Sequence, residues 1–244
     1  MIYFDNAATT YPKPRVVYDA VIRAMTDAGG NPGRSAHKLS MAAASIIYDC
    51  RCELAEFFGC SAPENVIFTY NATYALNMAI KGLLSRGDHV LISNFEHNSV
   101  LRPVAALSQR SVTYDIFDAT GTAEQTINSI KSLVRRNTAA IICSHVSNVC
   151  GFELPIAEIG AYCAARHIKF IVDAAQSAGT LPVDMHACNI DALCIPSHKG
   201  LYGIAGVGML IFNDKYKEGK LPFEPVIEGG SGVNSLNIEM PSMP

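Results

Sequence analysis

The chain has 244 residues, of which 49% are hydrophobic and 17% are charged, and its formal net charge is −3. This length can bury a sizeable core, as one large domain or slightly more. Without a basic run, the composition argues against a partner such as nucleic acid or an acidic membrane surface. No segment approaches the roughly 20 uncharged apolar residues of a membrane-spanning helix, and the opening MIYFDNAATT lacks a signal-peptide pattern. We therefore expect a cytoplasmic protein.

The first part of the chain predicts two helices. Pro14 followed by VVYDAVIRAM places a proline in the first turn, and Gly29 and Gly30 lie past the end. After the loop GGNPGRS, residues 38–58 form a longer, alanine-rich helical pattern that ends at Gly59.

From residue 64 onward, short apolar runs alternate with helical patterns, which indicates βαβ units and a mostly parallel sheet with helices on both faces. Two last runs follow without a long helix between them, so we expect the final strand to pair antiparallel. The predicted strands are 64–70, 88–93, 112–117, 139–145, 168–174, 191–196 and 206–213, and the predicted helices are 72–84, 99–109, 123–135 and 155–166.

Polar residues follow five of these runs directly. In open parallel sheets, ligands bind outside the carboxyl ends of the strands. Because those ends lie at one edge, we expect a single site to collect the five segments. They are Asn71–Thr73, Phe95–His97, Ser147–Asn148, Asp173–Gln176 and Ser197–Lys199.

Lys199, in PSHKGLYGIAGVG, is the candidate nucleophile. A lysine between a strand end and a glycine-rich turn can be partly desolvated, which lowers its pKa and frees the amine for a Schiff base. The alternative is an ordinary solvated surface lysine. The neighbouring Ser197 and His198 favour the first interpretation, since both can bind a phosphate.

The other candidates each have an ordinary structural alternative. Asp173 can pair with a protonated pyridine nitrogen, and Gln176 can reach the same ligand; alternatively, they form a turn or helix cap. Thr73 lies at the start of a helix that follows a strand, where free backbone N–H groups can bind a phosphate. Alternatively, a side chain at this position caps the helix and satisfies those N–H groups.

His97, in NFEHNSV, has a ring that can stack on a cofactor and a pKa suited to proton transfer, or it bonds to the backbone at a strand end. Asn148, in SHVSNVCG, can hold a ring hydroxyl, or it is a turn asparagine.

Eight cysteines raise the question of disulfides or a metal site. The size of the chain, the lack of an export signal and the apolar surroundings of several cysteines favour small reduced core residues. No CxxC pair occurs, and we predict no metal site. They are Cys50, Cys52, Cys60, Cys143, Cys150, Cys163, Cys188 and Cys194.

The sequence resembles the cysteine desulfurases of the class V aminotransferase family, which depend on pyridoxal 5′-phosphate (PLP). The resemblance starts with FDNAATTYPKP, runs through NATYALNMA, EHNSV and HVSNVCG, and is most specific in VDAAQSAG and SHKGLYGIAGVG. It implies an α/β fold, the large domain of an aspartate aminotransferase-like PLP enzyme. We expect an N-terminal segment at 1–20 and the PLP-binding domain at 21–244.

The resemblance also implies roles for the candidates at the ring. Lys199 would form the Schiff base with the cofactor and move a proton between the substrate Cα and the cofactor. His97 would stack on the ring, and Asp173 would pair with its nitrogen. Gln176 and Asn148 would bond to the phenolic oxygen.

At the other end of the cofactor, Thr73, Ser197 and His198 would bind the phosphate. The implied reaction converts L-cysteine to L-alanine and passes sulfur to an enzyme cysteine and then to an acceptor protein, within a homodimer. Family members continue past residue 244 into a smaller domain with the nucleophilic cysteine and a carboxylate-binding arginine. We therefore expect a truncated form with low or no activity. GGSGVNS (229–235) resembles a glycine- and serine-rich loop of one subgroup.

Other interpretations stay open at this point. Selenocysteine lyase and other class V aminotransferases share the PLP-binding motifs, and a PLP-binding remnant without turnover would also keep them. A nucleotide-binding α/β domain is disfavoured because neither GxGxxG nor GxxxxGK[ST] occurs.

Overall fold

A computed structural model describes residues 2–32 and 37–227. The segment 229–235 lies outside them. The helices are α1 (Arg15–Asp27), α2 (Lys38–Phe57), α3 (Ala72–Leu83), α4 (Asn98–Ala106), α5 (Ala123–Leu133), α6 (Ile156–Arg166) and α7 (Asp214–Lys217). The strands are β1 (Val66–Thr69), β2 (His89–Ser93), β3 (Thr113–Phe117), β4 (Thr138–Ser144), β5 (Lys169–Asp173), β6 (Ala192–Pro196) and β7 (Gly208–Phe212).

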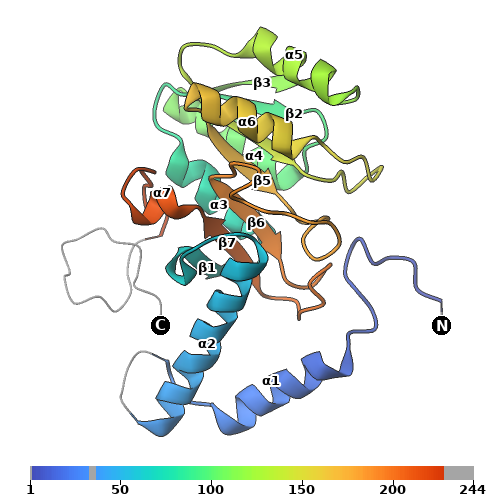
Figure 1. Cartoon of the computed structure of the whole chain (residues 1–244), viewed down its shortest axis with the longest axis vertical. Helices are drawn as coiled ribbons and strands as arrows, with labels where there is room; N and C mark the ends of the chain where they lie inside the picture. Colours follow the sequence, from blue (N-terminus) through green and yellow to red (C-terminus); the bar gives the residue numbers. More distant parts are fainter. Residues whose placement is uncertain (1, 33–36, 228–244) are drawn as a thin grey trace.

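The strands form a seven-stranded sheet in the order β1-β7-β6-β5-β4-β2-β3 (Figure 1). Pairs among β2 to β6 are parallel, while β7 pairs antiparallel with both β1 and β6. This confirms the predicted mostly parallel sheet and the antiparallel last strand. The carboxyl ends of β1 to β6 therefore lie at one edge.

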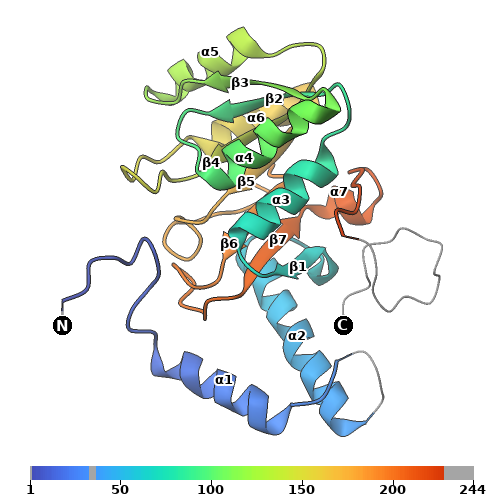
Figure 2. The ribbon, with the colours of Figure 1, turned by 180° about the vertical axis from the view of Figure 1, so that it is seen from behind.

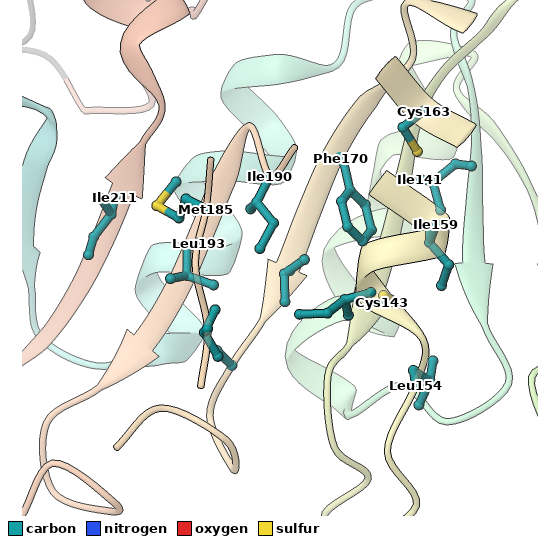
Figure 3. Close-up of a cluster of buried hydrophobic side chains, with 14 of the residues drawn as sticks. Ile141, Cys143, Leu154, Ile159, Cys163, Phe170, Met185, Ile190, Leu193 and Ile211 are labelled. Atoms are coloured by element: carbon teal, nitrogen blue, oxygen red, sulfur yellow. The ribbon is translucent and has the colours of Figure 1, made fainter. Parts of the chain in front are cut away.

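Helices cover both faces of the sheet, as predicted. α5 and α6 lie on one face and α3 and α4 on the other, as the two opposite views show (Figures 1 and 2). Each face has its own buried apolar cluster. In the cluster under α6, the ring of Phe170 on β5 packs near Ile141 and Ile159, and none of the three is exposed (Figure 3). Continuous burial of β6 and β7 explains their uninterrupted apolar sequences.

The two N-terminal helices differ from the rest because they extend away from the sheet (Figures 1 and 2). α1 has no buried residue, and Val16, Ile22 and Met25 are exposed. The helix also runs across residue 20, so the boundary we expect there falls inside a regular element. In the part of the chain described here, no helix has both the length and the apolar character required to cross a membrane.

Some local expectations need adjustment. Pro14 lies just before α1 rather than inside its first turn. The predicted helix 99–109 ends as an α-helix at Ala106 and continues as the 3-10 helix η2 (Leu107–Arg110). The short elements η1 (Pro63–Asn65) and α7 were not predicted, because three or four residues show no periodicity.

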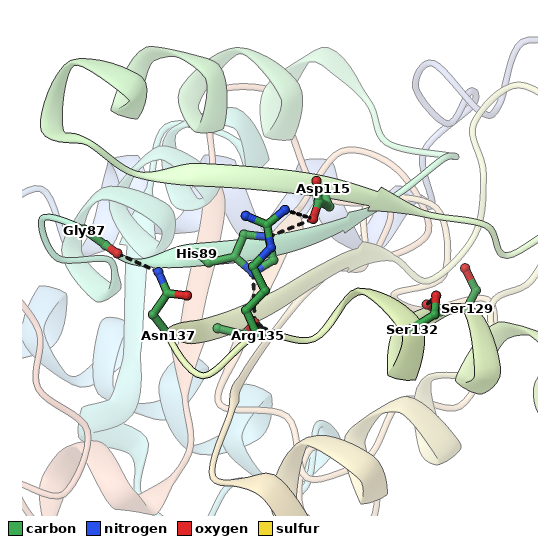
Figure 4. A network of polar contacts seen from close by, with 8 residues as sticks. Gly87, His89, Asp115, Ser129, Ser132, Arg135 and Asn137 are labelled. Carbon is green, nitrogen blue, oxygen red and sulfur yellow. Dashed lines mark hydrogen bonds and ion pairs between the residues drawn. The ribbon is translucent and has the colours of Figure 1, made fainter.

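A buried polar network lies toward the amino ends of β2, β3 and β4 (Figure 4). His89 is fully buried; its Nδ1 is 2.8 Å from Thr138 Oγ1 and its Nε2 is 3.3 Å from Asp115 Oδ2. Arg135 pairs with the same carboxylate. Burial, helped by the charge of Arg135, lowers the pKa of His89, so the imidazole stays neutral. Since ligands bind at the opposite edge, this network serves the fold.

Candidate functional site

A cavity of about 400 Å³ opens at the carboxyl ends of the strands. Seven of the eight residues predicted to form the site line it: Thr73, His97, Asn148, Asp173, Gln176, His198 and Lys199. Segments far apart in the sequence thus converge at one edge, as the parallel sheet requires. The cavity is also lined by Asp5, Ala7, Ala8, Asn71, Ala72, Ser99, Ser144, Val146, Ala175 and Pro196.

Ser197 is the one predicted site residue that does not line the cavity. Its hydroxyl donates to the carbonyl oxygen of Ile204 at 2.5 Å, and its own carbonyl oxygen accepts from the Gly203 N–H. The side chain therefore closes the turn that follows β6. Its contact with a phosphate stays a prediction.

The turns that follow β5 and β6 pack directly on each other. Gly179 has a left-handed backbone (φ +81°), and a Cβ there would lie 2.5 Å from the carbonyl oxygen of Gly200. A Cβ on Gly200 would lie 2.2 Å from the carbonyl oxygen of Ala178. Both glycines are thus required for a backbone-to-backbone contact that side chains would prevent. This contact fixes Lys199, next to Gly200, against the strand that ends at Asp173.

One carbonyl oxygen anchors the N-terminal segment on the same turn. His198 O accepts from the Thr10 N–H, from the hydroxyls of Thr9 and Thr10 and from Lys13 Nζ, each at 3.1 Å. Gln176 Nε2 donates to the carbonyl oxygen of Ala7 at 3.2 Å. The motif FDNAATTYPKP therefore forms a wall of the cavity, a role that sequence reasoning missed although the motif carried the family resemblance.

Asp173 and Lys199 form the charged centre of the cavity. Asp173 is only 5% exposed, and its Oδ1 accepts from the Ala175 N–H at 2.9 Å. Burial raises the pKa of Asp173, while that N–H and the charges of Lys199 and His97 oppose the rise. Burial lowers the pKa of Lys199, and the charge of Asp173 opposes this. Among residues 2–32 and 37–227, Asp173 thus carries a hydrogen bond at one oxygen only, so the other can receive a cationic N–H of a ligand.

The N-terminus of α3, at the cavity wall, favours an anion. Asn71 caps α3 by accepting from the Tyr74 N–H at 2.8 Å, so the earlier N–H groups at Ala72 and Thr73 have no partner within the helix. A Cβ on Gly208 would lie 2.5 Å from the Asn71 backbone, so glycine lets β7 approach this turn. Free N–H groups at a helix N-terminus favour a phosphate or carboxylate.

His198 points to the same ligand chemistry. Its Nδ1 is buried without a hydrogen-bond partner among residues 2–32 and 37–227. Burial lowers its pKa, and the charges of Lys199 and Lys13 lower it further. A neutral donor near two cations is suited to an anionic oxygen, which would satisfy the unpaired nitrogen.

His97 is held at the start of α4. Its Nδ1 accepts from the Ser99 N–H at 3.1 Å and lies 2.8 Å from Ser99 Oγ, which makes His97 the N-cap of the helix. With Nδ1 used in this way, Nε2 is the nitrogen left for a ligand. The structural alternative for His97, a bond to the backbone at a strand end, is therefore present as well. This bond orients the imidazole ring.

A model of the family described as Aminotransferase class-V matches residues 2–242. The chain belongs to the class-V aminotransferase family. A protein named cysteine desulfurase IscS, from Glaesserella parasuis, is 35% identical over 237 residues, or 94% of this chain and 56% of that relative. The chain spans about half the length of the curated relatives it matches.

Solved structures of relatives share the fold. The apo cysteine desulfurase of Thermococcus onnurineus superposes with a TM-score of 0.84 at 29% identity, over 93% of this chain and 56% of that one. SspA in complex with cysteine gives a TM-score of 0.83 at 31% identity, over 94% and 65%. Together with the sheet topology, these likenesses confirm the predicted fold class of the family's large domain.

We predict that Thr10→Val loosens the turn after β6, because it removes the hydroxyl contacts with the carbonyl oxygens of His198 and Lys199. Amide hydrogen exchange at Tyr202 and Gly203 should then become about five- to tenfold faster, the effect of losing about one hydrogen bond. Thr26→Val on the exposed helix α1 is the control and should leave both rates unchanged. Equal rates in wild type and Thr10→Val would contradict this anchoring role.

Proposed function

We propose that the chain binds PLP through Lys199 and is the cofactor-binding part of a cysteine desulfurase. The observation that carries the proposal is a half-buried lysine in one cavity with a buried aspartate and an unpaired histidine donor. An aminotransferase fold with relatives named cysteine desulfurases supports the same conclusion.

The residues present fit the cofactor at its ring. Within the described chain, only Oδ1 of Asp173 has a hydrogen bond, so Oδ2 would hold the protonated pyridine nitrogen. His97 would lie against the ring through its imidazole, and Gln176 and Asn148, both at the cavity wall, would bond to the phenolic oxygen. PLP, when bound, supplies an electron sink for the bonds of the substrate Cα.

The residues also fit the phosphate. The donors for a phosphate among the lining residues are His198 Nδ1, the first N–H groups of α3 and the Thr73 hydroxyl. Ser197 would join them only if its hydroxyl left the Ile204 carbonyl oxygen. A phosphate there would give the buried Nδ1 of His198 a hydrogen-bond partner. This support for a phosphate does not depend on the family.

Proton transfer falls to Lys199 and His97. A lysine with a lowered pKa carries a neutral amine for more of the time at neutral pH, so Lys199 can take the proton from the substrate Cα. His97, with Nε2 free and Nδ1 fixed by Ser99, can move a second proton. The charges of Lys199 and His97 oppose the rise in the pKa of Asp173 that burial causes, which favours the carboxylate that would pair with the pyridine nitrogen.

L-Cysteine is the proposed substrate, since one structural relative is described in complex with cysteine. L-Alanine and a sulfur passed to an enzyme cysteine and then to an acceptor protein are the proposed products. We also propose a cytoplasmic homodimer. None of the eight cysteines lines the cavity, and no arginine does so in the described chain. The proposal therefore assigns the sulfur-accepting thiol and the group that binds the substrate carboxylate to none of the described residues that line the cavity.

Lys199→Ala should abolish the visible absorption band that PLP acquires on binding a lysine, because the amine that forms the linkage is lost. Adding PLP to the purified proteins and recording their spectra measures this. Lys131→Ala, an exposed lysine on α5, is the matched control and should keep the band. A band of wild-type strength in Lys199→Ala would refute the assignment.

The polypeptide of residues 1–244 alone should bind PLP but release alanine and sulfide from L-cysteine slowly or not at all, because no cysteine lines the cavity. Both products are measured in the same reaction, with a dithiol added to collect sulfur. Robust turnover would show that a thiol within these residues reaches the substrate. Cys150→Ser would then identify whether the exposed Cys150 is that thiol.

A further inference from the structure

Glu96 is a carboxyl group beside the cavity that the proposed chemistry does not use. It lies in the turn between β2 and α4, and three hydrogen-bond donors converge on it. Ser144 N–H donates to Oε1 at 2.8 Å, Ser144 Oγ donates to Oε2 at 3.2 Å, and Ser93 Oγ donates to Oε1. The carboxyl group therefore joins the carboxyl end of its own strand, β2, to that of β4.

These contacts fix the turn that carries His97. Ser93 Oγ accepts from the Phe95 N–H at 3.2 Å, and the Phe95 ring stacks on Phe152 with centroids 5.1 Å apart. His97, the next residue after Glu96, then caps α4. The path from β2 to the imidazole thus has a single polar attachment to β4 in the described chain, at Glu96.

The attachment also reaches Asp173. Ser144 pairs with Asp173 in the register of β4 and β5, and both line the cavity. One serine therefore contacts Glu96 with its N–H and hydroxyl while its strand neighbour carries the carboxylate at the centre of the site.

We propose that Glu96 is a positioning residue: its carboxyl group locks the turn that carries His97 onto β4, beside Asp173. Its role in cofactor binding rests on the proposed function, whereas the lock itself does not.

The charge state of Glu96 fits this role. Burial raises the pKa of Glu96 to about 8; the bonds from Ser93 and Ser144 oppose the rise and the charge of Asp173 adds to it. The titratable groups that face it are Asp173 on β5 and the buried Cys143 thiol on β4. At neutral pH Glu96 is thus mainly an uncharged acid. In that form it carries a proton of its own, so one of the two serine hydroxyls accepts that proton instead of donating.

Two variants separate the geometry from the charge. Glu96→Gln keeps the shape and the hydrogen-bonding capacity of an uncharged acid but cannot ionise, whereas Glu96→Ala removes the lock. Glu158→Gln, at an exposed position on α6, is the control. Urea unfolding of each apo protein establishes that the variants fold.

The first readout needs no cofactor. In Glu96→Ala, amide exchange at Phe95 and Ser144 should become about tenfold faster, while Glu96→Gln and the control should match wild type within about twofold. Wild-type rates in Glu96→Ala would overturn the lock. If Glu96→Ala does not fold, Ser93→Ala, which removes one donor to Glu96, takes its place, and exchange at Ser144 should again become faster; an unchanged rate there would overturn the lock.

The second readout is the pH titration of the bound-PLP band. Above about pH 8, ionised Glu96 adds a negative charge near Asp173 and favours protonated nitrogen at Lys199. The pH at which the bound-PLP band loses this proton should therefore be lower in Glu96→Gln than in wild type by about 0.5 unit. In the control, Glu158→Gln, this pH should not change. An unchanged transition would refute the placement of Glu96 beside the site. Absence of any band in wild type would refute the proposed function, and amide exchange would still decide the lock.

Discussion

The site depends on a backbone contact between two turns. Gly179 and Gly200 let the segments after β5 and β6 touch where any Cβ would collide, and the His198 carbonyl oxygen then ties the N-terminal segment to the same point. Lys199 is thereby held in a half-buried position near a buried carboxylate. Without this contact, a lysine on a glycine-rich turn would be solvated, its pKa would be ordinary and its amine would stay protonated.

Charge balance in the cavity follows from that placement. Lys199, Asp173 and Glu96 all have shifted pKa values, and the charge of Asp173 acts on both of the others. The charges of Lys199 and His97 oppose the rise in the pKa of Asp173 that burial causes. Burial also raises the pKa of Glu96, and the charge of Asp173 adds to that rise. An uncharged Glu96 then serves as a structural link rather than a competing anion. Shifted pKa values that cluster in one cavity are typical of functional sites.

The sequence was sufficient to predict most of the fold and much of the site. Apolar runs marked all seven strands, and the short connection before Gly208 predicted the antiparallel β7. The position of β1 at an edge next to β7 could not be predicted, since strand order depends on long-range packing. Ser197 was predicted by residue type alone, but its hydroxyl closes a turn. Glu96 was visible among polar strand-end residues, yet its role required knowing that β2 and β4 are neighbours.

Chemical trapping at Lys199 tests the central claim most directly. The 244-residue protein is mixed with PLP, reduced with borohydride to make the lysine linkage permanent, digested and examined by mass spectrometry. The account predicts that the phosphopyridoxyl group is found on the peptide that contains Lys199, and that prior addition of excess inorganic phosphate reduces its yield. Labelling spread over exposed lysines, with none on Lys199, would contradict it.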